Sequence, residues 1–169
     1  YKGMEDIINA FQQFSERETQ LIIVGKCSDP NYASTIKEQI QKSNHQNIIF
    51  VNTYIANTEM QYYMNAADVV ILNYKDVPLN PGSLILAADF NKTIIAPAHP
   101  ILRETGANLD LITFESENIE QLADAMKTTF SKKNKPSTPN TLNNSPKETG
   151  KALMNFYKTL LSDEKRYVG

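Results

Sequence analysis

Short apolar runs alternate with amphipathic segments along most of this chain. Residues 20–24, 47–51 and 68–72 are rich in Ile, Val, Leu and Phe. Runs of this length are typical of strands buried on both faces, and a helix between two strands makes them parallel. The pattern therefore predicts a doubly wound α/β fold, Rossmann-like, with a parallel sheet and helices on both faces.

The apolar spacing and the turn residues set the expected bounds of each element. Asn31 and Asn57 are expected to cap the second and third helices, because their side chains accept hydrogen bonds from a helix's first N–H groups. We expect helices over 4–15, 32–42, 57–66, 83–90, 101–105 and 119–130, and strands over 20–24, 47–51, 68–72, 93–96 and 109–114.

The end of the chain changes composition. Residues 131–146 are rich in Lys, Asn, Ser, Thr and Pro, which predicts a mobile loop or linker. Residues 147–162 regain helical apolar spacing and are expected to form a C-terminal helix that either packs back across the sheet or docks on a neighbouring domain. At 169 residues the chain is interpreted as one domain.

Composition excludes several classes of protein. Apolar residues make up 41% and charged residues 21%, and the net charge of -2 gives no reason to expect a nucleic-acid partner. The single cysteine, Cys27, excludes an internal disulfide, and no apolar run is long enough to span a membrane. Nothing has metal-ligand spacing or a nucleophile–base arrangement, so no metal site and no catalytic residue is predicted. The chain starts at Tyr1 beside an expected helix, and we interpret it as a fragment of a longer protein.

A Gly-Ser step opens the apolar helix that follows the 68–72 strand. Ligands of parallel sheets lie beyond the carboxyl ends of the strands, and a helix beginning there offers unpaired N–H groups to an anion. Gly82 and Ser83 are therefore predicted to bind a diphosphate. Ser83 is also a plausible N-cap, and the two roles are compatible.

Other strand ends supply further candidates, each with a simpler structural explanation. Gly25 and Lys26 either approach a phosphate or form an ordinary turn with a solvated lysine. Thr53 and Tyr54 either flank a nucleobase or pack on a helix. Lys75 either neutralises a phosphate or is an ordinary surface lysine.

His99, just past a strand end, either touches a sugar or is inert. Its imidazole titrates near neutral pH, so proton transfer is the third possibility at this position.

Several motifs occur in an order that resembles a known family. Tyr1-Lys2-Gly3 before an amphipathic helix, Leu21-Ile22-Ile23-Val24-Gly25, and Ala67-Asp68-Val69-Val70-Ile71-Leu72 are similar to successive motifs of one domain type. It is the C-terminal domain of GT-B glycosyltransferases of the group 1 type (glycosyltransferase family 4). The resemblance covers about residues 1–130.

The resemblance implies a domain that binds a nucleotide-diphosphate sugar, with no metal ion or other cofactor. Lys2 takes the place of a lysine that helps to neutralise the diphosphate. The implied contacts are Gly82, Ser83, Lys2 and Lys75 for the diphosphate, Gly25, Lys26, Thr53, Tyr54 and Leu86 for the nucleobase and ribose, and Asn80 and Pro81 for the sugar.

The central turn departs from the commonest family pattern. Many similar members carry two glutamates here, one for the donor sugar and one for the ribose. When Thr93-Ile94-Ile95-Ala96 is matched to the family's PVIA segment, Pro78 and Leu86 stand at those two places. The turn instead resembles an N-S-G-S variant with Pro81 in place of the first serine.

For the full-length protein, the resemblance implies transfer of a hexose to a glycan or lipid-linked acceptor in polysaccharide or cell-surface glycan biosynthesis. The acceptor half would lie upstream, the isolated fragment would be inactive, and the location would be cytoplasmic or peripheral at the inner membrane. One alternative is a degenerate donor domain that binds a nucleotide or a protein without turnover. The other is a flavodoxin-like or receiver-like domain, which requires clustered acids where only Asp29 and Asp76 occur.

Overall fold

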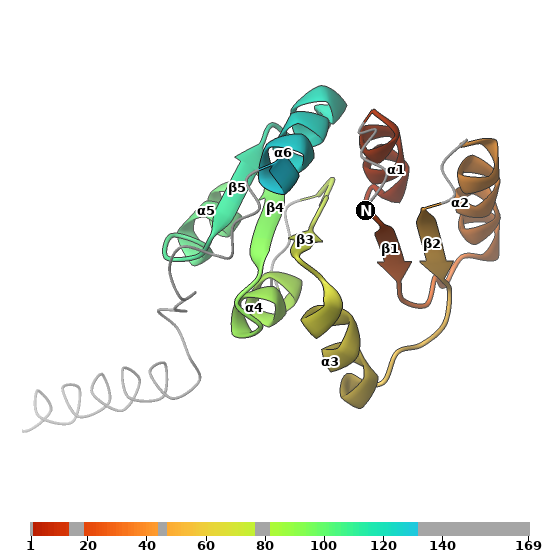
Figure 1. Cartoon of the computed structure of the whole chain (residues 1–169), viewed down its shortest axis with the longest axis horizontal. Coiled ribbons are helices and arrows are strands. Elements are labelled where there is room, and N and C mark those ends of the chain that lie inside the picture. Colours follow the sequence, from red (N-terminus) through yellow and green to blue (C-terminus); the bar gives the residue numbers. More distant parts are fainter. Residues whose placement is uncertain (1, 14–18, 44–46, 77–81, 132–169) are drawn as a thin grey trace, which may run out of the picture.

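The computed structural model describes residues 2–13, 19–43, 47–76 and 82–131. The expected C-terminal helix over 147–162 lies outside these residues, as does the expected 131–146 loop except for Ser131. Figure 1 shows the arrangement of the elements. They are α1 (Met4–Gln12), β1 (Leu21–Val24), α2 (Pro30–Lys42), β2 (Ile48–Val51), α3 (Asn57–Ala66), β3 (Val69–Ile71), α4 (Gly82–Asp89), β4 (Thr93–Pro97), α5 (Pro100–Thr105), β5 (Leu111–Phe114) and α6 (Ile119–Ser131).

All of the described strand pairs are parallel, which confirms the predicted doubly wound α/β class. β1 pairs with β2, and β3, β4 and β5 pair in that order. In Figure 1, α1, α2 and α6 lie above the strands, and α3 and α4 lie below them. Each strand is joined to the next by a helix, so the parallel order follows from the alternation in the sequence.

β4 is the most buried strand, and its two faces belong to two different cores. All five of its residues are buried. Ile95 faces the core formed with α1 and α6, whereas Ile94 and Ala96 face the core formed with α4 and α5. Side chains alternate between the faces of a strand, so a continuous apolar run is what such a position requires.

Helix α1 joins the two groups of strands. In the described part of the chain β1 and β3 are not paired with each other. One apolar cluster nevertheless contains Phe11 of α1, Ile23 of β1, Ile95 of β4 and Met126 of α6. Because α1 contacts both α2 and α6, burial of its apolar stripe holds both sheets in one domain.

The face of the first sheet opposite α1 is thinly covered. Ile22 and Ile49 are register partners on β1 and β2, and their exposed fractions are 41% and 40%. Helix α3, on that side in Figure 1, has no buried residue. The stability of this domain therefore depends mainly on the face covered by α1, α2 and α6.

Two predicted helix caps are wrong. Asp29, not Asn31, caps α2, and its carboxylate accepts a hydrogen bond from Asn31 N at 2.9 Å. Pro30 takes the first helical position because it has no N–H group to satisfy, so the cap lies two residues upstream of the predicted one. Asn57 is itself the first helical residue of α3, and the Glu59 carboxylate accepts a hydrogen bond from Ala56 N at 3.3 Å.

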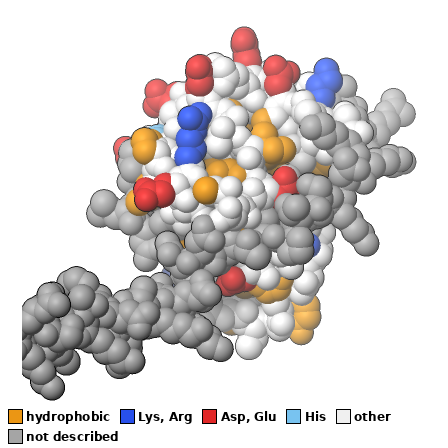
Figure 2. Space-filling view, turned by 90° about the vertical axis from the view of Figure 1, so that its left-hand side faces the viewer, with side chains coloured by type: hydrophobic (Ala, Val, Ile, Leu, Met, Phe, Trp, Pro, Cys, Tyr) orange, Lys and Arg blue, Asp and Glu red, His pale blue; other side chains and the backbone are white. Residues whose placement is uncertain are grey.

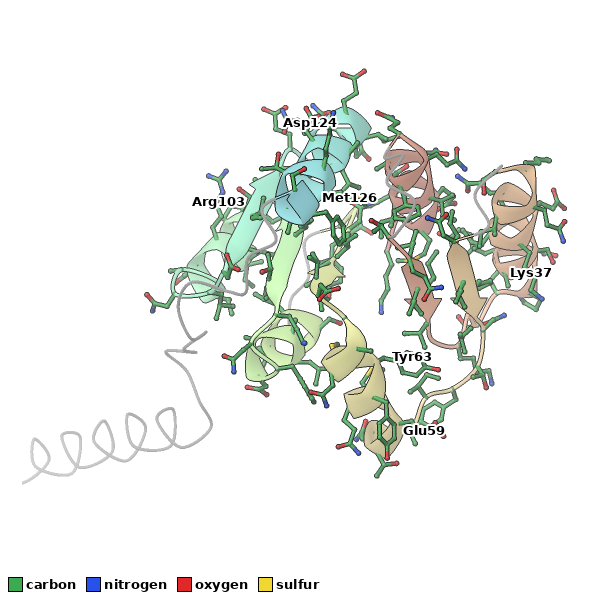
Figure 3. All side chains as sticks on the ribbon, viewed as in Figure 1. Lys37, Glu59, Tyr63, Arg103, Asp124 and Met126 are labelled. Atoms are coloured by element: carbon green, nitrogen blue, oxygen red, sulfur yellow. The ribbon has the colours of Figure 1, made fainter. Side chains whose placement is uncertain are left out.

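Replacement of Met126 by Ala should destabilise the domain by about 2–4 kcal/mol, because it removes a fully buried side chain and leaves a cavity that neighbouring side chains do not fill. Met126 points from α6 towards α1 in Figure 3, whereas Asp124 is exposed on the same helix. Asp124→Ala is the control and should change the free energy of unfolding by less than about 0.5 kcal/mol. Urea denaturation of both variants measures the difference, and equal effects would show that the α1–α6 contact does not support the domain.

Candidate functional site

The loops that follow the strands come together at one edge of the domain. Cys27 N donates to Asn52 Oδ1 at 2.8 Å and links the loops after β1 and β2. His99 Nε2 lies 3.2 Å from the Tyr74 carbonyl oxygen and links the segments after β3 and β4. The carboxyl ends of the strands therefore present two pairs of linked loops, one in each sheet.

The start of α1 is held against the end of β3. Asn73 Nδ2 donates to the Gly3 carbonyl oxygen at 2.9 Å, and Gly3 precedes α1 in a left-handed conformation with φ 50° and ψ 47°. A Cβ at Gly3 would overlap Asn73 Nδ2 and would lie 3.0 Å from Lys75 Cε. Both the conformation and the close approach select glycine. The turn consequently places Lys2 beside the segment that carries Lys75.

Lys75 is paired with an acidic side chain. Its Nζ lies 3.1 Å from Asp6 Oδ2. The hydrogen bond to Asp6 raises the pKa of Lys75, against an opposing effect of burial, and the charges of Asp6, Glu5 and Glu117 raise it further. The lysine is thus protonated at neutral pH, and neighbouring carboxylates offset part of its charge.

The first turn of α4 is open. An added Cβ at Gly82 would meet no atom within 4 Å in the described structure, whereas Leu84, Ala87 and Ala88 are buried and fix the helix on β4. Because a short turn leads from the end of α4 into β4, α4 begins at the edge where the strands end. Its first N–H groups have no partner within the helix.

One prediction in this turn is wrong and others fall outside the described structure. Ser83 is the second residue of α4, not its N-cap. Asn80 and Pro81, predicted to contact the sugar, lie outside the described residues, as does Pro78. Leu86 is half-buried on α4.

The residues predicted to bind the nucleobase lie at the end of the first sheet. Gly25 has φ 135°, and its N–H donates to the Val51 carbonyl oxygen at 3.1 Å. Lys26 and Thr53 are exposed. Tyr54 is 72% exposed, so the alternative in which its ring packs on a helix is wrong. An exposed ring at a strand end is available to stack on a flat ligand.

Two supporting residues were not given a role by the sequence. Asn73 is 5% exposed. Asp6 accepts a hydrogen bond from the Asn73 amide and forms an ion pair with Lys75. The only sequence signal is a polar residue directly after an apolar strand and an acid in the first turn of a helix. Their pairing joins positions 67 residues apart, which no local pattern reveals.

Two hollows on the described surface do not coincide with the predicted contacts. The larger, about 420 Å³, is lined by residues 115–120, and the smaller, about 270 Å³, lies between α1 and α2. Glu115, Glu117 and Glu120 line the larger hollow, and their charge disfavours a phosphate. Acidic side chains are also spread over the upper part of the face in Figure 2. The open start of α4 is therefore the better anion site.

Two kinds of feature are absent from the described ranges. Those ranges hold no group of three or more His, Cys, Asp or Glu side chains placed to bind a metal ion. None of the helices in them is both long enough and apolar enough to cross a membrane.

Gly3→Ala should destabilise the domain by about 1–2 kcal/mol, since the new Cβ forces a left-handed alanine and displaces the Asn73 amide. Gly82→Ala is the matched control, because its Cβ meets open space. Thermal unfolding of both variants tests this, and equal melting temperatures would mean that the turn relaxes without cost.

The ion pair of Lys75 predicts a pH dependence. Because the pKa of Lys75 is raised above 10.5 by folding, the pair stabilises the folded state fully below that pH and is lost as the pH rises through the raised value. Lys75→Met should therefore cost at most about 1 kcal/mol near neutral pH, since the side chain is partly exposed, and progressively less above pH 10.5. Urea denaturation at several pH values measures this, with Lys37→Met as the exposed control (Figure 3). A difference that grows above pH 10.5 would contradict the assignment.

Residues 1–148 match the family described as glycosyl transferases, group 1. HepE from Anabaena, solved with UDP and glucose, superposes with a TM-score of 0.73 at 18% identity, over 84% of this chain and 39% of its own. HepE solved with UDP-glucose gives a TM-score of 0.69 at 21% identity, over 82% of this chain and 38% of its own. No match to a curated protein was found.

Two further structures are similar. Sucrose-phosphate synthase from Thermosynechococcus elongatus gives a TM-score of 0.66 at 22% identity, over 98% of this chain and 41% of its own. The C-terminal domain of the group 1 glycosyl transferase LpcC from Francisella tularensis gives 0.63 at 19% identity, over 77% of this chain and 69% of its own. The chain spans about two fifths of HepE and of the synthase.

Proposed function

We propose, because the chain belongs to the group 1 glycosyl transferases, that it binds the nucleotide-diphosphate sugar donor of a sugar-transfer reaction. The match over residues 1–148 confirms the family that the sequence motifs predicted. We further propose that the full-length protein transfers a hexose to a glycan or lipid-linked acceptor in polysaccharide or cell-surface glycan synthesis. The acceptor is held by an upstream domain, and the chain by itself does not turn over donor. The location proposed with it is cytoplasmic or peripheral at the inner membrane.

The observation that carries the proposal is the open first turn of α4. Buried apolar residues fix the rest of the helix, so its N-terminal N–H groups are held in place before a ligand arrives. The helix dipole adds positive potential at the same point. Gly82 leaves room for a phosphate to approach the backbone closely.

The mechanism follows from the charge that develops during transfer. As the bond from the anomeric carbon breaks, the nucleoside diphosphate departs with increased negative charge. Fixed N–H groups of Gly82 and Ser83, together with Lys2 and Lys75, would stabilise that charge in the transition state. The protein's own groups would provide this stabilisation, with no metal ion.

The nucleobase end of the donor is assigned to the end of the first sheet. The exposed Tyr54 ring and Thr53 would flank the base, with Gly25 and Lys26 on the neighbouring loop. The hydrogen bond from Cys27 N to Asn52 Oδ1 holds the two loops together, so they form one surface. The UDP and UDP-glucose bound in HepE support a nucleotide-sugar as the ligand class.

A non-catalytic nucleotide- or protein-binding domain is the second candidate. Leu86 stands where a glutamate that meets the ribose is expected, and its side chain accepts no hydrogen bond. Asp6 also offsets part of the Lys75 charge. Donor hydrolysis or transfer by the full-length protein would exclude this candidate, whereas nucleotide binding without turnover would support it.

Calorimetric titration of the folded chain with UDP and GDP tests the donor site. We expect binding of at least one nucleotide and a loss of at least about tenfold in affinity for Gly82→Val, because the β-branched side chain blocks the phosphate at the helix start. The fold should survive, since the added side chain points into open space.

Asn31→Val is the control for this experiment. It places the same side chain near the exposed start of α2, at the outer edge of the first sheet, and should leave nucleotide affinity unchanged. A folded chain that binds neither nucleotide would sink the proposed function. Binding that is indifferent to Gly82→Val would move the ligand away from α4.

A further inference from the structure

Asn73 is one of only two buried polar side chains that the described residues contain, the other being Thr93. Its amide nitrogen donates to the Gly3 carbonyl oxygen at 2.9 Å and lies 3.4 Å from Asp6 Oδ2. A buried amide is costly unless it is hydrogen-bonded, so these partners fix the orientation of the side chain.

The bond to Gly3 is not needed to begin α1. The Gly3 carbonyl oxygen already accepts the hydrogen bond of the helix's first turn from Ile7 N at 3.3 Å. The Asn73 amide uses the second lone pair of that oxygen. What this additional bond does is tie the turn before α1 to the end of β3, which is 70 residues away in sequence.

Two lysines lie close to this connection in the sequence. Lys2 directly precedes Gly3, and Lys75 follows Asn73 by two positions. The Asp6 Oδ2 atom lies 3.4 Å from the amide nitrogen of Asn73 and 3.1 Å from the ammonium nitrogen of Lys75. One buried side chain thus sets the place of the turn that carries Lys2 and contacts the acid that holds Lys75.

We propose that Asn73 is a positioning residue for the diphosphate: it fixes the Lys2–Gly3 turn at the carboxyl edge so that the lysines act on one ligand. This inference rests on the proposed function. Asn73 acts through Lys2 and Lys75 and does not itself meet the nucleotide. It is also specific to this chain's own residues, since it needs an amide donor after β3 and a left-handed Gly3.

Thr93 offers a matched comparison. It is equally buried at 5%, and its Oγ1 is hydrogen-bonded to Asp110 Oδ2 at 2.6 Å. It begins β4, so it lies at the amino end of the strand, on the side of the sheet away from the candidate site. Loss of its hydrogen bond should lower stability without moving either lysine.

The experiment compares Asn73→Leu with Thr93→Val, since each removes a buried polar group while keeping most of the volume. We expect both variants to melt at a lower temperature than the parent chain. UDP affinity, measured by calorimetry, should fall about fivefold or more for Asn73→Leu and stay within about twofold for Thr93→Val. Asn73→Ala, which adds no branched bulk, serves if the leucine variant does not fold.

A double-mutant cycle separates positioning from a general loss of stability. In a Lys2→Ala background, the Asn73 substitution should reduce UDP affinity much less than it does in the parent chain. The salt dependence of UDP binding should also weaken for Asn73→Leu and not for Thr93→Val, because fewer cationic contacts then reach the diphosphate.

The possible outcomes are distinct. If the parent chain binds UDP and Asn73→Leu binds it equally well, or if the Asn73 and Lys2 effects are additive, the positioning role is wrong and the proposed function stands. If a folded parent chain binds neither UDP nor GDP, the proposed function itself fails.

Discussion

The packing of α1 against both groups of strands is the interaction on which the rest of the domain depends. β1 and β3 are not paired in the described structure, so backbone hydrogen bonds do not join the two sheets there. Phe11 and its neighbours on α1 bury their side chains with residues of β1, β4 and α6 instead. Hydrophobic burial is non-directional, so it holds the sheets together but does not set the loops at their edge precisely.

Directional bonds supply that precision at the candidate site. The Asn73 amide and the Asp6 carboxylate join the start of α1 to the end of β3, and His99 joins the end of β4 to the same segment. Each bond is local in space and long-range in sequence. The same helix that completes the core therefore also delivers Lys2 to the carboxyl edge, and stability and binding are linked through α1.

At this edge, carboxylates offset part of the positive charge that the lysines supply. Lys75 is paired with Asp6 and lies in the field of Glu5 and Glu117, so a diphosphate must compete with carboxylates for it. In the first turn of α4, no described atom lies within 4 Å of a Cβ built at Gly82, so no described carboxylate crowds that point. The helix start is accordingly the stronger part of the proposed site, and the lysines refine it.

The alternation of apolar runs and helical segments determined the fold class, because parallel strands joined by helices admit few arrangements. The same sequence placed Gly82 at a helix start and predicted the family from ordered motifs. It misplaced the caps at Asp29 and Ala56, since the proline at 30 and the glutamate at 59 shift the first helical residue. Only the tertiary structure decided that Asn73 meets Gly3, that Asp6 forms an ion pair with Lys75 and that Tyr54 stays exposed. Those outcomes depend on contacts between residues far apart in sequence, which hydrophobic period and turn chemistry do not encode.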